Sequence, residues 1–421
     1  MSAEPTSEED PSTFDRARLR ANVPKIMILN SFWMFLVIMP VVVPLLESHG
    51  LDMQQVFWLQ SIFAGCIVLL EVPSGYLADL FGRRRSLILA GVFHGAAFTV
   101  LAVAQSFPAF VVFEILAALG NSFFSGSDVA LLYDTEAALG ERGDGTHTLG
   151  RKLLWAQIGE TVAAPIGGAL ALAGLHWPAL INAGVAWLPL FVAWTLVEPP
   201  RETLGHGHRE NFRRILSVIF RTSPILRLTF IALVTYGLAT LLAVWSFQGY
   251  WRSLGLSLGW FGVIWGAYNL TVALVGRAAH RLERRVGAQW LILAIAILPV
   301  VGYGGMALFG LEIVPGWLAL VGGVICGFAF QVGRGLNQVV VKGAMNERIP
   351  PELRATANSL SSLGVRVFFV MLGPALGWGY DREGYALTFG VVAGLFALFF
   401  FTVGLPLWLE IGRESRAKEK R

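Results

Sequence analysis

Apolar runs of about twenty residues recur along this chain of 421 residues, and short polar segments separate them. A helix needs about 20 apolar residues to cross a bilayer, and lipid offers no hydrogen-bond partner to an irregular backbone. The runs at 37–46 and 395–405 show no alternation with a period of two, which excludes a transmembrane β-barrel. Twelve helical spans are predicted, near residues 26–46, 56–77, 86–104, 108–133, 153–173, 177–197, 225–250, 257–276, 288–308, 315–341, 356–378 and 386–409.

Lysines and arginines divide unequally between the two sets of loops. Of the 32, 28 fall on one side, Arg252 and Arg382 fall on the other, and Arg334 and Arg366 lie within spans. Because cytoplasmic loops are enriched in these residues, we expect both termini to be cytoplasmic. The net charge of +4 comes from clusters between apolar runs, so it indicates orientation in a membrane and not binding of nucleic acid. We expect an integral protein of a bacterial inner membrane.

Motifs for metals and cofactors are missing from the sequence. The seven histidines and two cysteines show no ligand spacing, and no glycine-rich loop precedes a Lys-Ser or Lys-Thr pair. We therefore expect no cofactor, no metal site and no enzyme active site. We expect the chain to be a monomer. Its expected partners are membrane lipid, protons and a small-molecule substrate.

The longest polar interruption divides the predicted spans into two groups of six. Within it, Phe212, Ile215 and Ile219 recur at helical spacing among arginines, which is typical of an amphipathic helix on a membrane surface. The predicted domains are a cytoplasmic N-terminal tail (1–24), a six-helix bundle (25–197), a cytoplasmic linker (198–224), a second six-helix bundle (225–409) and a cytoplasmic C-terminal tail (410–421).

A glycine turn with three arginines follows the second predicted span. The segment Gly75–Arg85, GYLADLFGRRR, resembles the loop signature of major facilitator superfamily (MFS) transporters, Gly-x-x-x-Asp-(Arg/Lys)-x-Gly-Arg-(Arg/Lys). Leu80 stands where the family usually has a base. The resemblance implies an all-α integral membrane fold with 12 transmembrane helices in two pseudosymmetric six-helix bundles, the MFS fold.

The resemblance also implies a conformational gate at this turn. It implies that Asp79 and Arg83 brace the cytoplasmic ends of the helices, with Arg83 paired to Asp134. Because glycine lets helix ends approach closely, we expect neither Gly75 nor Gly82 to tolerate a bulky side chain.

The fifth and eleventh predicted spans carry glycines and prolines at similar positions. They resemble the Gly-Pro-x-x-Gly-Gly signature of MFS antiporters, which favours antiport, whereas close helix packing in lipid is the alternative explanation. The residues are Gly159, Pro165, Gly167 and Gly168 in the fifth span and Gly364, Gly373, Pro374 and Gly377 in the eleventh.

Ionisable residues inside the predicted spans segregate by half. Spans 1 to 6 carry acids and no base, whereas spans 7 to 12 carry two bases and no acid. Each such charge costs roughly 2.5–3.5 kcal/mol near a helix centre and is retained mainly where it functions. The acids are Glu71, Glu114, Asp128 and Glu160, and the bases are Arg334 and Arg366.

Equivalent positions in the two halves predict two ion pairs across the central cavity, Asp128 with Arg334 and Glu160 with Arg366. We assign these four residues to substrate binding or proton coupling. Glu114 is a further candidate, with simple access to water as the alternative.

We expect Glu71, which lies beside the turn, to be a structural partner of Arg83 or Arg84.

These features favour a secondary transporter that works by alternating access. Proton-coupled efflux of a small organic compound is the first expectation, because of the antiporter-like glycines and the acids in the spans. The first alternative is proton-coupled uptake of an anionic solute, since Arg334 and Arg366 could bind a carboxylate or phosphate bidentately. A receptor or lipid-handling protein on the same scaffold is the second alternative, although the short loops leave little room for a partner.

Overall fold

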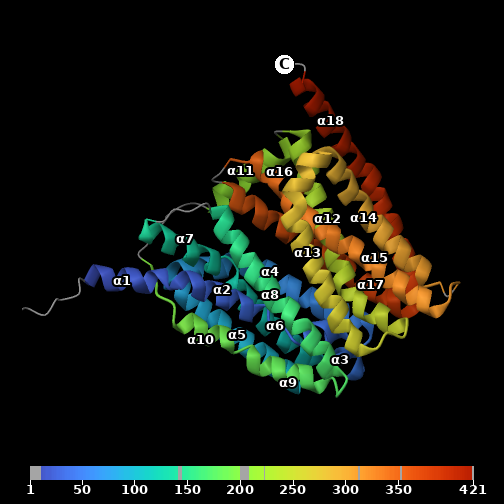
Figure 1. The fold of residues 1–421 in the computed structure, drawn as a ribbon, viewed down its shortest axis with the longest axis horizontal. Helices are drawn as coiled ribbons and strands as arrows, with labels where there is room; N and C mark the ends of the chain where they lie inside the picture. Colours follow the sequence, from blue (N-terminus) through green and yellow to red (C-terminus); the bar gives the residue numbers. More distant parts are fainter. Residues whose placement is uncertain are drawn as a thin grey trace, which may run out of the picture.

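The computed structural model describes residues 11–140, 145–199, 208–221, 223–311, 313–350 and 353–419. Within these ranges the chain forms helices with short connections and contains no strand (Figure 1). The all-α expectation is therefore confirmed.

The described residues of the first half form ten α-helices and one short 3-10 helix. Its longest helices are those whose sequences are continuously apolar. The elements are α1 (Pro11–Arg20), α2 (Asn22–Trp33), η1 (Met39–Val41), α3 (Val42–Ser48), α4 (Met53–Phe81), α5 (Arg83–Val103), α6 (Phe107–Phe124), α7 (Ser127–Leu139), α8 (Gly145–Ala171), α9 (His176–Val185) and α10 (Leu188–Trp194).

The second half begins after the linker helix α11 (His208–Arg221), whose Ile215 and Ile219 are fully buried. A helix is therefore present where the sequence predicts an amphipathic one. The helices that follow are α12 (Pro224–Ser253), α13 (Leu258–Val286), α14 (Ala288–Phe309), α15 (Gly316–Leu336), the π-helix η2 (Asn337–Val341), α16 (Lys342–Glu347), α17 (Arg354–Phe399), the π-helix η4 (Phe400–Gly404) and α18 (Leu405–Glu419).

Several spans that the sequence predicts as single helices are interrupted in the structure. The fourth span is split between α6 and α7 at Gly126, whose φ of 81° is open to glycine but strained for other residues. The first is interrupted at 34–38, between α2 and η1. Helix α17 contains span eleven and the first part of span twelve as two helical segments that meet at a kink at Gly384, where φ is 78°. Nine described stretches are long and apolar enough to cross a membrane, and the longest, Thr356–Glu414, contains this break, which is consistent with twelve passes.

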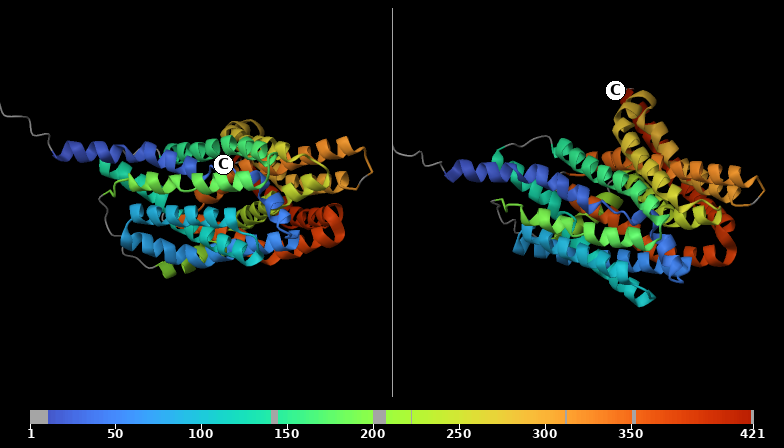
Figure 2. Two further views of the ribbon diagram at one scale, coloured as in Figure 1. Left: turned by 90° about the horizontal axis from the view of Figure 1, so that it is seen from below. Right: turned by 60° about the horizontal axis from the view of Figure 1, so that its bottom comes forward.

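The two halves pack against each other through four long helices. Helix α4 lies on α17 and α8 lies on α13, so each half contributes two helices to the interface. In Figure 1 the halves converge toward α3 and α9 and diverge toward α1 and α7 on one side and α16 and α18 on the other; Figure 2 shows the same divergence. We call the convergent end the short-loop end, after connections such as 104–106, and the opposite end, which carries Arg83–Arg85, the basic end.

Polar contacts join the halves at the short-loop end. The carboxylate of Asp381 accepts hydrogen bonds from the backbone N–H groups of Met53 (3.0 Å) and Gln54 (2.8 Å) at the start of α4. Arg252 and Glu47 form an ion pair at 2.6 Å. These contacts close this end of the molecule.

Glycines let the interface helices approach closely. A Cβ added to Gly168 would lie 2.8 Å from the carbonyl oxygen of Gly259, and one added to Gly377 would lie 2.6 Å from the backbone of Gln54. A Cβ at Gly167 would collide with the carbonyl of Val37. Close packing therefore explains these glycines of the fifth and eleventh spans.

Candidate functional site

A cavity of about 590 Å³ lies between the halves. The first half lines it with largely apolar residues, Met39, Phe63 and Ala64, and with the amide of Gln60. The second half lines it with helices α12 and α15 to α17 and with the π-helix η2. The two walls therefore differ in chemistry.

Three cations line the second wall. Arg334 on α15 and Arg366 on α17 are partly buried, and Lys342 at the start of α16 is exposed. The lining residues that the structure describes include no Asp or Glu, and no described carboxylate lies within ion-pair distance of Arg334 or Arg366. The cavity is therefore strongly cationic.

The π-helix η2 separates two of these cations. Its first residues, Asn337 and Gln338, face the cavity, and the buried side-chain oxygen of Asn337 has no hydrogen-bond partner. A π-helix usually occurs as a single turn inside an α-helix, and such turns are frequent at functional sites. Along an ideal helix the eight residues from Arg334 to Lys342 span about 12 Å, so the cations follow the length of the cavity.

Arg366 is held by its own helix and faces an acid of the other half. Its Nη1 donates to Ser362 Oγ at 2.5 Å. The carboxylate of Glu71 interacts electrostatically with the Arg366 guanidinium. Ser359, one turn before Ser362, donates to Glu71 Oε1 at 2.6 Å. The acid on α4 thus reaches α17 at the cavity rim.

The predicted structural role of Glu71 at the turn is therefore wrong. The backbone N–H groups of Arg83 and Arg84 instead donate to the carboxylate oxygens of Glu198, each at 2.7 Å. Glu71 lies more than two turns before the end of α4 and reaches the second half instead.

The predicted pair of Asp128 and Arg334 is also wrong. Asp128 lies in the first turn of α7, is 1% exposed and forms an ion pair with Lys152 of α8. Helix α8 begins at Gly145, eight residues before the predicted span, so Lys152 lies inside the bundle. The first half therefore neutralises one of its own acids.

Glu160 does not meet Arg366 either. Its Oε1 accepts a hydrogen bond of 3.1 Å from the indole of Trp265, and both side chains are buried where α8 packs on α13. Glu160 is thus an interface residue between the halves.

Glu114 has no access to water in this conformation. It is 3% exposed, and Gln60 Nε2 donates to its Oε1 at 2.7 Å. Since Gln60 also lines the cavity, Glu114 lies one side chain behind the cavity wall.

The gate residues occupy the turn between α4 and α5. Gly82 has a φ of 104°, and a Cβ there would lie 2.9 Å from Glu198 Oε1. Gly75 has nothing within 4 Å of such an atom, so the expected close approach at Gly75 is wrong for this conformation. The side chain of Asp79 lies outside the described residues, and the pair of Arg83 with Asp134 stays a prediction.

Sequence reasoning missed three residues of the cavity. Lys342 directly follows the predicted tenth span, so its sequence position places it in the basic loop. Gln60 and Asn337 are uncharged, so a search for buried charge passes over them. The sequence feature that could have identified Gln60 and Asn337 is a polar side chain inside a span, which indicates a functional site less strongly than a charged one.

Comparisons with known proteins agree with this architecture. No curated protein matches the chain. Among solved structures, the nucleoside transporter NupG, in a point-mutant form, is similar with a TM-score of 0.77 and 13% identity, over 92% of this chain and 99% of that one. A bacterial homolog of the human lysosomal transporter Spinster, inward-facing and unoccupied, has a TM-score of 0.64 and 18% identity, over 93% and 96%.

A point-mutant form of a peptide transporter, POT, in complex with sulfate gives a TM-score of 0.69 and 15% identity, over 98% of this chain and 96% of that chain. At these identities the likeness shows the fold. The family model described as Major Facilitator Superfamily matches residues 26–345. The two halves, the cavity between them and this match agree: the chain belongs to the Major Facilitator Superfamily and is a membrane transporter.

Proposed function

We propose that this protein is a secondary transporter of a small organic anion, bound in the central cavity by Arg334, Arg366 and Lys342. The observation that carries the proposal is a cavity with three cations and no acid among its described lining residues. A cationic cargo would be repelled by these three cations, and Glu71 at the rim offsets only part of that charge. Of the functions that the sequence left open, the geometry favours transport of an anionic solute.

The cavity has the size and chemistry for such a cargo. Its volume of about 590 Å³ falls within the roughly 300–1,000 Å³ typical of small-molecule sites. Each guanidinium can hold a carboxylate or phosphate bidentately. Met39, Phe63 and Phe369 provide apolar surface for the remainder of the solute.

The conformation supports alternating access. The short-loop end is closed by the Asp381 and Arg252 contacts, whereas Lys342, at the other end of the cavity, is exposed. If the basic end faces the cytoplasm, as its lysines and arginines suggest, the cavity faces inward. Transport then requires opening of the short-loop end.

Proton coupling is part of the proposal and rests on two acids close to the cavity. Glu71 reaches α17 at Ser359, about two turns before Arg366, and Glu114 contacts the cavity wall through Gln60. The glycines that favoured export are explained by packing, so flux is to be measured in both directions.

Matched acid and amide compounds test the cargo. Purified protein is screened by thermal shift against small carboxylic acids and phosphates, each paired with the neutral amide or ester of the same size. The acids should raise the melting temperature because ligands stabilise the state that they bind, and the amides should not. Equal stabilisation by the neutral members would contradict the proposal.

Variants then locate the site. Arg334→Gln or Arg366→Gln should weaken binding of the best acid by about 10- to 100-fold, the value of a hydrogen bond to a charged group. Arg277→Gln, an exposed arginine of α13, is the control and should bind normally. In proteoliposomes the same variants should lose flux driven by a proton gradient.

A further inference from the structure

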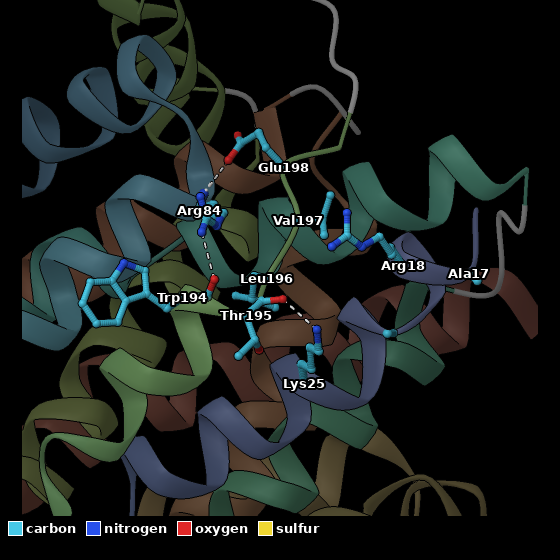
Figure 3. A pocket seen from close by; sticks show the side chains of 10 residues that line it. Ala17, Arg18, Lys25, Arg84, Trp194, Thr195, Leu196, Val197 and Glu198 are labelled. Carbon is cyan, nitrogen blue, oxygen red and sulfur yellow. Dashed lines mark hydrogen bonds between the residues drawn. The ribbon is translucent and has the colours of Figure 1, made fainter. Parts of the chain in front are cut away.

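A second cavity, of about 750 Å³, lies at the basic end, away from the central one. It is lined by Ala17 and Arg18 of α1, Lys25 of α2, Arg84 of α5 and the segment from Trp194 to Glu198 (Figure 3). Helices distant in the sequence therefore bring three cations to one place. None of these residues lines the central cavity.

The floor of this basic-end pocket is held in a fixed conformation. Asn22 is fully buried, and its side chain makes two hydrogen bonds to the backbone of Val197, at 2.8 and 3.0 Å. Glu198, the last residue of this segment, is held by the backbone N–H groups of Arg83 and Arg84, which donate to its carboxylate. The segment is thus anchored on both sides.

The cations are positioned by backbone carbonyls and keep donors to spare. Lys25 Nζ donates to the carbonyl of Thr195 at 2.6 Å, and Arg84 Nη2 donates to that of Trp194 at 2.8 Å (Figure 3). An ammonium has three donors and a guanidinium five. The buried Nε of Arg84 has no hydrogen-bond partner.

The pocket has an excess of positive charge. Glu198 is the one carboxylate among its lining residues, and both of its oxygens are already occupied by backbone N–H groups. Three cations, Arg18, Lys25 and Arg84, therefore line the pocket with this single acid. The pocket is therefore suited to an anion with several acceptor oxygens, such as a phosphate.

The position of the pocket favours a lipid over a free phosphate. It lies where membrane helices end, beside Trp194, the last residue of α10, which is 57% exposed. Phe191, one turn earlier on α10, is 55% exposed, so an apolar strip leads from the pocket along the helix. Tryptophan at a helix end typically lies at the headgroup level.

We propose that the basic-end pocket binds the phosphate of an anionic phospholipid headgroup, with Lys25 and Arg84 as its main ligands and Arg18 at its edge. The acyl chains then lie along Phe191 and Trp194. Because Arg84 is the second residue of α5 and directly follows the turn at Gly82, the lipid would stabilise that turn.

Native mass spectrometry and thermal unfolding test the site. Wild type, in nanodiscs of phosphatidylcholine with or without phosphatidylglycerol, should retain phosphatidylglycerol on release and melt at a higher temperature with it. The double variant Lys25→Gln/Arg84→Gln should retain at least fivefold less. The control Arg284→Gln/Arg285→Gln removes the same charge from the exposed basic end of α13 and should retain the wild-type amount.

Further arms separate the alternatives. Lys25→Arg/Arg84→Lys keeps the charge and should recover most of the retention, which excludes misfolding as the cause of loss. Equal retention by Lys25→Gln/Arg84→Gln and wild type would overturn the site. Stabilisation by soluble glycerol phosphate equal to that by phosphatidylglycerol would overturn its assignment to a lipid.

Discussion

Gly82 shows how one residue can be required by two independent constraints. Its φ of 104° lies where side chains are strained, and the Glu198 carboxylate occupies the space that a Cβ would need. The carboxylate is fixed there by the first N–H groups of α5, which attract negative charge. The loop signature therefore includes a partner that lies more than a hundred residues away.

Gly82→Ala should destabilise the protein by about 1–3 kcal/mol, because it forces strained backbone and displaces Glu198. Gly75→Ala is the matched control. Gly75 is an exposed position of α4 with nothing within 4 Å of an added Cβ, so alanine should be neutral or stabilise by about 0.5–1 kcal/mol. Thermal unfolding in detergent measures both, and equal melting temperatures would contradict this account.

Glu71→Gln should strengthen binding of an anion in the central cavity. The carboxylate acts on Arg366 and competes with the cargo for it, so its neutralisation should improve affinity roughly fivefold, for about 1 kcal/mol of lost repulsion. Titration with the most stabilising acid checks this. Glu283→Gln, on α13, is the control, and weaker binding by Glu71→Gln would show that the acid supports the cargo site.

Charge was visible in the sequence, but its partners were not. The acids and arginines of the spans were found by counting, yet Asp128 pairs with Lys152 and Glu160 with Trp265. Which residue a side chain faces depends on the rotation of its helix and on where that helix begins. Hydropathy determines neither the rotation nor the start of a helix. The predicted fifth span begins eight residues after the start of α8 and therefore leaves out Lys152.

At the scale of helices, apolar length predicted most of the fold. The spans near 86–104 and 288–308 correspond to α5 and α14 within a few residues. The breaks at Gly126 and Gly384 were not predicted, because a glycine inside an apolar run is equally compatible with tight packing. Only the three-dimensional structure distinguishes the two roles.

The start of α4 and the middle of α17 form a clasp between the halves. Asp381→Ala should weaken the closed short-loop end by about 1.5–3 kcal/mol, the value of hydrogen bonds to a charged group. With Cys66 and Cys326 replaced by serine, a cysteine at Val244 in the cavity should then react faster with an impermeant maleimide added from the short-loop side.

Glu383→Ala is the control for the clasp, since it removes an acid two residues further along the same turn of α17. It should leave the labelling rate at the wild-type value. If Asp381→Ala also leaves the rate unchanged, the clasp does not limit opening of this end.

At the scale of the molecule, alternating access requires the two halves to separate at the end where they now touch. The tightest contact there is between α8 and α13, where a Cβ on Gly262 would collide with the carbonyl of Ala164. Any side chain at Gly262 is therefore incompatible with the closed short-loop end. It remains compatible with a state in which the halves have moved apart.

Gly262→Ala should thus shift the population toward the state that is open at the short-loop end. Spin labels at His49 and Ser257, one in each half, should report a longer distance in this variant. Gly276→Ala on the same helix has nothing within 4 Å and should leave the distance unchanged. A lower melting temperature without a longer distance would mean that α8 and α13 form a fixed hinge, and the opening would then have to occur between α4 and α17.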